Sequence, residues 1–190
     1  MEALIPLAIL AAIVLLPFVW LIANYNGFVR VRQHIRESWS DIEVELKRRY
    51  ELIPNLVETV RGYAKHERDV LEMVVKLRNQ AMANHGQAGE QAIDETALLI
   101  GMKRLFAVSE AYPQLKADAH FLALQQELAN CEDRIAAARR FFNANVREMN
   151  QKCDSFPTNM LAGMFGFERT TYFELSNEAE RVVPRVALTT

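Results

Sequence analysis

The stretch that decides the architecture is ALIPLAILAAIVLLPFVWLIA, residues 3–23, a run of 21 residues without a charge. A helix rises about 1.5 Å per residue, so this run can cross the roughly 30 Å hydrocarbon core of a bilayer. A cleaved signal peptide is the alternative, but the run is longer than a signal core and no small-residue cleavage site follows it. We therefore expect residues 1–27 to form one transmembrane anchor, with Trp20 and Tyr25 near an interface.

The charges that flank this run predict its orientation. Only Met1 and Glu2 precede it, whereas six basic residues follow it: Arg30, Arg32, Arg36, Lys47, Arg48 and Arg49. The positive-inside rule then places the N-terminus outside and the rest of the chain in the cytoplasm. We expect a single-pass protein of the cell (inner) membrane, and the low cysteine count of two agrees with a reducing compartment.

The composition favours helices and gives no sign of nucleic-acid binding. The chain has 190 residues, of which 51% are hydrophobic and 24% charged, with only seven glycines and six prolines. Scarce helix breakers favour helix over sheet. The formal net charge is −2, and binding to a duplex needs a clustered basic face, so no nucleic-acid partner is expected.

An apolar stripe at spacings of four and three residues follows the anchor. Its members are Ile35, Trp39, Ile42, Leu46, Ile53, Leu56, Val60 and Tyr63. This heptad-like pattern predicts helices packed lengthwise. The stripe keeps its phase across Pro54, which favours a kinked but continuous helix over a clean break. The pairs Glu43–Lys47 and Glu45–Arg49 have the spacing of ion pairs on one helix face, and we expect that face to be solvated.

Two further long helices are predicted, so we expect an all-α fold in which the transmembrane helix is followed by an antiparallel bundle of three long helices and a short C-terminal helix. The polar segment NHGQAGEQ, residues 84–91, predicts a loop, and a second helix should run from about Ala92 to Tyr112, where Pro113 ends it. Asp118 is the expected N-cap of a third helix. The stripe of this third helix is the clearest in the chain: Phe121, Leu124, Leu128, Cys131, Ile135, Ala138, Phe142 and Met149.

Asn145 and the two cysteines lie on or beside this third stripe. Asn145 either fixes the register of an oligomer or sits at a wet edge of the bundle. Cys131 and Cys153 lie roughly 33 Å apart on one helix, too far for a disulfide, so both are expected to be small core residues.

The C-terminal part changes character after Phe156. The segment NMLAGMFGF, residues 159–167, is apolar and contains Gly163 and Gly166, and Tyr172 and Phe173 follow it. We expect a short helix and a turn that either fold onto the bundle or contact the membrane or a partner. The candidate contact residues are Met160, Leu161, Met164, Phe165 and Phe167. The last ten residues are expected to be loosely ordered.

The sequence carries no recognisable catalytic, cofactor or metal site. Helical metal bundles use Glu-x-x-His pairs, and none of the four histidines has a glutamate three residues before it. His66–Glu67 begins a zinc-protease pattern, but Val70 occupies the position of the second histidine. We therefore expect no enzyme activity and no cofactor.

Several long runs resemble the LemA family. They are SWSDIEVELKRRYELIPNLVETVRGYAKHE (38–67), LFAVSEAYPQLKAD (105–118), FLALQQELANCEDRIAAARRFFNANVREMNQKCDSFP (121–157) and GMFGFE (163–168). The resemblance implies a bacterial protein with one N-terminal membrane helix and a helical-bundle domain, here residues 28–168, followed by a tail, residues 169–190. The family has no established activity, so the resemblance implies no catalytic residues. Its most family-like runs, such as Arg48–Tyr50, Ile53–Leu56 and Phe106–Leu115, are either helix junctions or a binding face.

Helix lengths suggest a function. A first helix continuing to about Ala83 would measure roughly 80 Å, whereas the second and third would measure about 30 and 54 Å and could not cover it. Its membrane-proximal stripe would then need other copies or a membrane partner, with Ile35, Trp39, Ile42 and Leu46 as the candidate oligomer interface. If the chain reverses at Pro54 instead, four shorter helices close a bundle by themselves.

Two functions follow from these alternatives. The first is a non-enzymatic integral membrane scaffold, homo-oligomeric, that organises or shapes the bilayer. The second is a monomeric adaptor or regulator of another membrane protein, such as a transporter, sensor or protease. The expected partners are therefore the lipid bilayer, further copies of the chain and another envelope protein.

Overall fold

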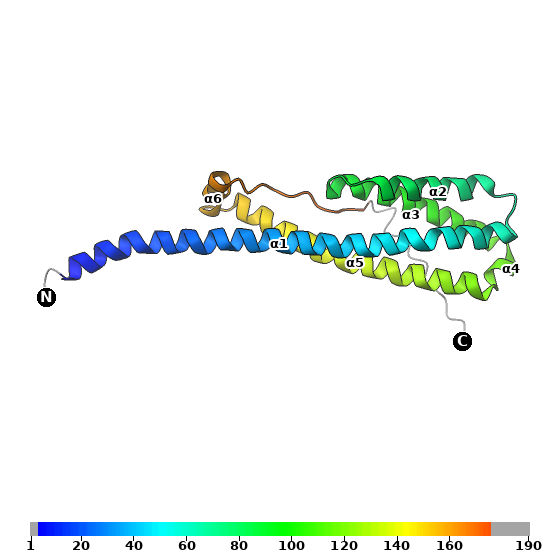
Figure 1. The fold of residues 1–190 in the computed structure, drawn as a ribbon, viewed down its shortest axis with the longest axis horizontal. Coiled ribbons are helices and arrows are strands. Elements are labelled where there is room, and N and C mark those ends of the chain that lie inside the picture. Colours follow the sequence, from blue (N-terminus) through cyan, green and yellow to red (C-terminus); the bar gives the residue numbers. More distant parts are fainter. Residues whose placement is uncertain (1–3, 176–190) are drawn as a thin grey trace. The chain divides into compact units, whose positions relative to one another are not determined.

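The computed structural model describes residues 4–175, with side chains from residue 11 onward, and its regular structure in this range is entirely helical (Figure 1). The helices are α1 (Leu4–Tyr63), α2 (Arg68–Ala83), α3 (Ala88–Glu110), α4 (Pro113–Lys116), α5 (Ala119–Asp154) and α6 (Thr158–Phe165). The predicted all-α architecture with a long apolar N-terminal helix is confirmed. The loose order predicted for the last ten residues concerns a segment outside the described range.

The first helix is continuous through Pro54, as predicted, and has 60 residues. It does not continue to Ala83, and it does not reverse at Pro54 either. The chain turns at residues 64–67, so one predicted helix is two helices. Because the chain turns here, α2 can bury Leu71, Val74 and Ala81. The free energy of this burial outweighs the tendency of residues 64–67 to continue the helix.

The ends of the later helices follow local rules. The predicted loop 84–91 shortens to residues 84–87, because α3 begins at Ala88 rather than at Ala92. The Asn84 Oδ1 accepts the backbone N–H of Gly86 at 2.8 Å and closes this turn. Pro113 occupies the first position of α4, where its missing N–H costs nothing.

Asp118 and Gly166 mark two helix ends. The carboxylate of Asp118 accepts the backbone N–H of Phe121 at 2.8 Å, which confirms it as the cap of α5. Gly166 has a φ of 68° and ends α6 in the left-handed region that favours glycine.

The chain divides into two compact units, and α1 and α5 contribute to both. The anchor unit combines α1 up to Glu37 with residues 142–170, and the bundle unit combines residues 38–141 with the described residues from Thr171 on. The predicted domain limits at residues 27 and 168 stay a prediction.

The bundle unit packs segments of α1, α2, α3 and α5 side by side. Helices α2 and α3 approach closely at Gly101, where an added Cβ would lie 2.8 Å from the Leu77 Cδ1. Helices α1 and α5 meet where the Cys131 thiol donates to the Glu45 carbonyl at 3.3 Å.

Candidate functional site

The centre of the bundle unit holds a buried ion network. Arg49 on α1 and Glu95 on α3 each expose only 1% of their side chains and form an ion pair. The other terminal nitrogen of Arg49 donates to Glu132 on α5, with distances of 2.9 and 3.2 Å to the two carboxylate oxygens. One guanidinium therefore joins three helices, which a planar five-donor group does better than an ammonium.

Tyr50 and Gln91 extend this network. The Tyr50 hydroxyl donates to Glu95, and the Gln91 Nε2 donates to Glu95 at 2.8 Å and to the Ala81 carbonyl at 3.0 Å. Burial raises the pKa of the Tyr50 phenol, so the hydroxyl stays neutral and acts as a donor. The Glu95 carboxylate thus accepts hydrogen bonds from side chains of α1 and α3 at the same time.

Two buried atoms of this region lack a hydrogen-bond partner among the described residues. They are the Arg49 Nε and the Glu45 Oε2. A buried ionic group with an unmade hydrogen bond costs free energy, so the network does not maximise stability. We interpret it as a device that fixes which faces of the helices meet.

Pro54 and Arg78 explain how α1 continues past a proline. Proline has no N–H, so the carbonyl of Tyr50, four residues earlier, loses its usual helical donor. The Arg78 Nε on α2 donates to this carbonyl at 3.0 Å. A side chain from the neighbouring helix therefore replaces the hydrogen bond that Pro54 removes.

A groove of about 390 Å³ opens beside the network. Its lining consists of Trp39, Glu43, Leu46, Lys47, Tyr50, Glu51, Arg78, Ala81, Met82, Asn84, His85, Gly86 and Gln91. Tyr50 and Gln91 belong to both the network and the groove. The lining mixes aromatic, aliphatic and charged groups of both signs, which suits binding.

The environment of the cysteines disfavours a nucleophilic role for Cys131. Burial raises the pKa of the Cys131 thiol to about 11, so its nucleophilic thiolate form is rare at neutral pH. Both cysteines are free thiols on α5, with Cys131 buried as predicted and Cys153 only partly buried. Within residues 4–175, no group of three or more His, Cys, Asp or Glu side chains is placed to hold a metal ion.

The predicted oligomer interface is only partly accessible in one chain. Ile42 and Leu46 are buried, at 0% and 4% exposure, whereas Ile35 and Trp39 are partly exposed. Trp39 donates to Glu43 at 3.0 Å and packs edge-on against another ring of the bundle unit, that of Phe173, at 5.6 Å.

The expected length mismatch, which motivated the interface, does not hold. The part of α1 from Phe28 to Tyr63 has 36 residues, as many as α5, because the first long helix ends at Tyr63 and not at Ala83. A helix of that length can accompany this part of α1 from end to end. The interface itself stays a prediction.

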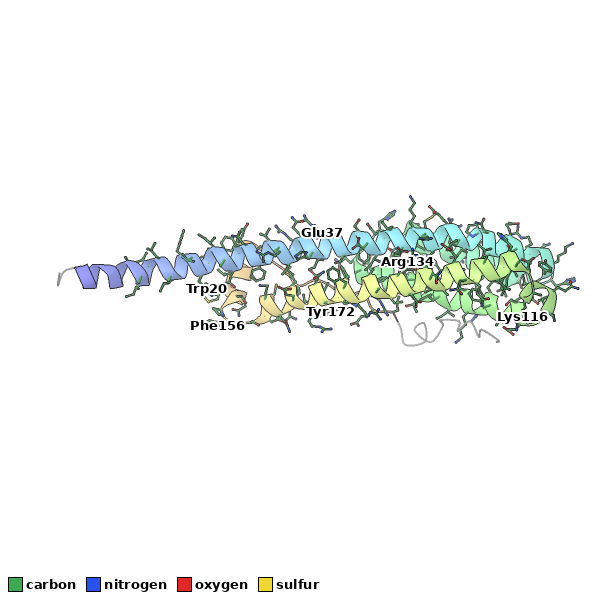
Figure 2. All side chains as sticks on the ribbon, turned by 90° about the horizontal axis from the view of Figure 1, so that it is seen from below. Trp20, Glu37, Lys116, Arg134, Phe156 and Tyr172 are labelled. Carbon is green, nitrogen blue, oxygen red and sulfur yellow. The ribbon has the colours of Figure 1, made fainter. Side chains whose placement is uncertain are left out.

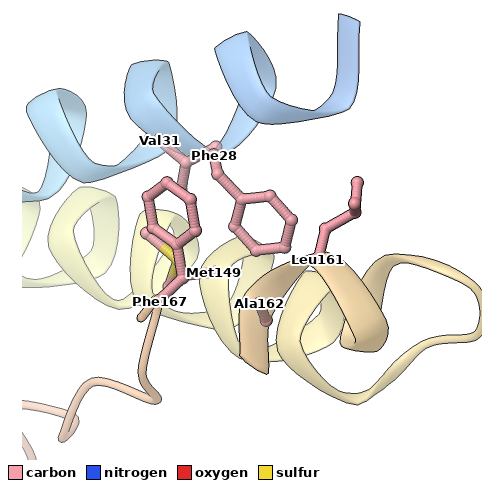
Figure 3. Packing of buried hydrophobic residues seen from close by; sticks show 6 residues of the cluster. All are labelled: Phe28, Val31, Met149, Leu161, Ala162 and Phe167. Carbon is pink, nitrogen blue, oxygen red and sulfur yellow. The ribbon is translucent and has the colours of Figure 1, made fainter. Parts of the chain in front are cut away.

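The predicted membrane or partner contacts divide into two groups in the anchor unit. Leu161 and Phe167 are buried, and they form a cluster with Phe28, Val31, Met149 and Ala162 (Figure 3). Met160, Met164 and Phe165 are exposed by 63%, 70% and 42%. Only the second group offers apolar surface to another molecule.

Asn145 occupies an edge of the anchor unit. Its Nδ2 donates to the His34 carbonyl at 3.3 Å, and the residue is partly exposed. This placement agrees with the wet-edge alternative, while a role in oligomer register stays a prediction.

The sequence patterns missed the ion network. Arg49 was expected on a solvated face with Glu45, and this is wrong, because Arg49 is buried and pairs with Glu95 and Glu132. A signal was present in the first stripe. No apolar residue fills the seam position between Leu46 and Ile53, and Arg49 lies there with Tyr50 beside it.

The apolar part of α1 has the length and composition of a membrane span. Its best window has a mean hydropathy of 1.7, with 6% of the window buried, and it is the one such helix among the described residues. Ile13, Leu16 and Val19 are exposed by 64%, 68% and 61%. The described chain therefore leaves most of this segment uncovered.

Comparison with known proteins identifies relatives over most of the chain. Residues 38–188 match the model of the LemA family. The chain is 27% identical over 178 residues to the magnetosome protein MamQ of Magnetospirillum gryphiswaldense, covering 80% of this chain and 65% of that protein. The magnetosome protein MamQ 2 of Paramagnetospirillum magneticum is 27% identical over 179 residues, covering 81% and 66%. The protein LemA of Metamycoplasma hominis is 25% identical over 162 residues, covering 85% and 73%. The chain therefore matches slightly less than two thirds of the length of the two MamQ proteins.

Proposed function

We propose, from the premise that this chain belongs to the LemA family, that it is a non-enzymatic membrane adaptor that presents a self-contained helical bundle to another envelope protein. Its N-terminus lies outside, the apolar part of α1 crosses the cell membrane, and the bundle lies in the cytoplasm. The basic residues after the span support this orientation.

The burial of the first stripe carries the proposal. Ile42, Leu46, Ile53, Leu56 and Val60 of this stripe are exposed by at most 4% within a single chain, and Ile35 and Trp39 are only partly exposed. A stripe that is largely buried in one chain leaves little apolar surface for a second copy. The outer faces of the bundle and the groove beside Tyr50 are then free for a different protein.

The absence of an enzyme site is part of the proposal. The charged groups of the network are held by one another, and the thiol of Cys131 has a pKa of about 11. These groups support structure, and the mixed lining of the groove suits binding.

A homo-oligomeric scaffold that organises or shapes the bilayer is the second candidate. Consecutive residues of the span, Ile13 to Leu16, are all exposed by 59–68%, so every side of the helix is uncovered at this level in one chain. If the protein is a monomeric adaptor, lipid covers all of these side chains. If it is an oligomeric scaffold, the spans of other copies cover one side of the helix.

The mass of the full-length protein in nanodiscs, measured by mass photometry, separates the two candidates. A monomer at high protein-to-lipid ratio supports the adaptor. A discrete multimer contradicts it and supports the scaffold. Substitution of Leu16 and Val19 by tryptophan then provides the control, because it should dissociate a multimer held by the span and leave the fold of the bundle unchanged.

A further inference from the structure

Helix α6 packs beside the last turns of the apolar span. Its Leu161 and Ala162 belong to the cluster of the anchor unit, and Leu21 of α1 packs against that cluster. The rings of Tyr25 and Phe165 meet edge-on, with centroids 4.9 Å apart. The inner face of α6 is thus fixed to α1 near residues 21–28.

The outer face of the same segment is apolar and uncovered. Phe156, Met160 and Met164 are exposed by 80%, 63% and 70%, and Phe165 by 42%. Single exposed apolar residues are common on soluble proteins, but four large ones within ten residues form a patch. In Figure 2, Phe156 and Trp20 lie at about the same position along the axis of α1.

The position of the patch along α1 indicates what covers it. Leu21 lies inside the uncharged run that ends at Ala23. A segment that packs on Leu21 therefore lies within about two helical turns of the hydrocarbon boundary whenever the run crosses a bilayer. Phe165 of the patch contacts Tyr25, two residues past the end of this run, so the patch adjoins the span.

Basic side chains border this region. The Arg32 guanidinium lies 5.2 Å from the centre of the Phe167 ring, and the Lys152 ammonium lies 5.7 Å from that of Phe28. The acidic neighbours are partly compensated, because Asp154 pairs with Arg169 and Glu148 lies 4.0 Å from Lys152. Arg and Lys side chains, with an apolar stem and a cationic end, are typical of the level of the lipid headgroups.

We infer that Phe156 and the outer face of α6 form a second membrane contact. This contact lies at the boundary between headgroups and acyl chains, in the leaflet from which α1 emerges toward the bundle. This inference rests on the membrane crossing of α1 and not on the adaptor role. The bilayer is the occupant because the patch adjoins the span, whereas a protein partner would have to bind at the same depth. The contact fixes the rotation of α1 about its axis, since one side of the helix is tied to the surface.

Tryptophan reporters with brominated lipids test this contact in the full-length protein. The reporter variant carries Met164→Trp together with Trp20→Phe and Trp39→Phe, in liposomes whose lipids are brominated either near the headgroup or deep in the chain. We expect the emission at position 164 to shift to shorter wavelength and to be quenched by the shallow bromines. A second reporter, Met160→Trp, should behave in the same way.

Two controls make the result decisive. Ala144→Trp in the same background is an exposed neutral site on α5 of the same unit, about 15 Å along the helix from its last residue, Asp154, and should not be quenched. A variant that keeps only Trp20 reports insertion of the span. Quenching of Trp20 without quenching at positions 160 and 164 would overturn the membrane contact, and so would protection of these sites in detergent by a second copy. Failure at Trp20 as well would overturn the membrane placement of α1 and the contact with it.

Discussion

At the scale of single residues, the most informative position is Arg49. It lies on the apolar seam of α1, yet it carries a charge that is 1% exposed and is held by Glu95 and Glu132. A buried pair contributes little net stability, but loss of one partner leaves an uncompensated charge in the interior. The network therefore makes the bundle intolerant of single changes at this point.

Replacement of Arg49 by methionine should lower the free energy of unfolding by about 3–5 kcal/mol, because Glu95 stays buried without its partner. The double variant Arg49→Met with Glu95→Leu should cost less than the sum of the two single changes. Denaturant titrations of the full-length protein in detergent, followed by circular dichroism, measure these values. Arg48→Met is the matched control, since the Arg48–Glu127 pair is exposed by 44% and 41% and its loss should change little. Additive single effects would contradict the coupling.

The two thiols should differ in reactivity. At pH 8 a pKa of about 11 instead of the ordinary 9.0 leaves Cys131 with about one hundredth of the usual thiolate. In the folded protein a disulfide reagent should modify Cys153 first, although burial raises its pKa as well, and Cys131 should react only after unfolding. The variant Cys153→Ser isolates the slow thiol. Rapid modification of this variant in its folded state would show that Cys131 is accessible.

At the scale of helices, the fold depends on side chains that complete the backbone of a neighbouring element. The carbonyl of Tyr50 lacks a donor because of Pro54, and Arg78 of α2 supplies one at 3.0 Å. The carboxylate of Asp118 caps α5 and also accepts the hydroxyl of Tyr63 at 2.9 Å, so it joins the end of α1 to the start of α5. These contacts determine where helices continue and where they begin.

The substitution Arg78→Met should lower stability by about 1–3 kcal/mol, because it leaves the Tyr50 carbonyl without a donor. The same substitution in a Pro54→Ala background should cost less, since the alanine introduced at that position supplies the helical N–H. A double-mutant cycle from denaturant titrations gives this difference directly. Equal costs in both backgrounds would mean that Arg78 does not compensate for Pro54.

Asp118 should make stability depend on pH in the acid range. The N–H of Phe121 and then the hydroxyl of Tyr63 lower the pKa of this carboxyl from its ordinary 3.8. A carboxylate with a lowered pKa stabilises the folded state above 3.8, and this contribution is lost as the pH falls through the folded pKa. The thermal midpoint of Asp118→Ala should therefore lie below that of the wild type at neutral pH and approach it in acid. Asp118→Asn keeps a cap acceptor without the charge, so at neutral pH its thermal midpoint should lie between those of Asp118→Ala and the wild type, and it should lack this part of the pH dependence.

At the scale of the whole molecule, one helix of 60 residues contributes to both the anchor unit and the bundle unit. The apolar part of α1 therefore continues into the bundle without an intervening loop. An adaptor of this kind would receive a partner on the bundle while α1 stays fixed in the bilayer.

The orientation of the chain is testable with C-terminal fusions. A green fluorescent protein fused after Thr190 should fluoresce, and an alkaline phosphatase fused there should be inactive, because the proposed orientation, based on the basic residues after the span, places the bundle in the cytoplasm. Substitution of Arg30, Arg32 and Arg36 by glutamine should weaken this bias. An active phosphatase in the unmodified chain would reverse the proposed topology.

The sequence by itself determined the apolar span, the all-helical class, the cap at Asp118 and the stripes of α1 and α5. Each of these depends on local spacing or local chemistry, which is readable along a single chain. Only the tertiary structure decided where the first helix ends, because the turn before α2 depends on apolar burial against α3. It also decided that Arg49 is buried, since the carboxylates that make its burial tolerable lie 46 and 83 residues away. For the same reason the sequence does not show which face of α6 is exposed, because this depends on the tertiary contact of its other face with α1.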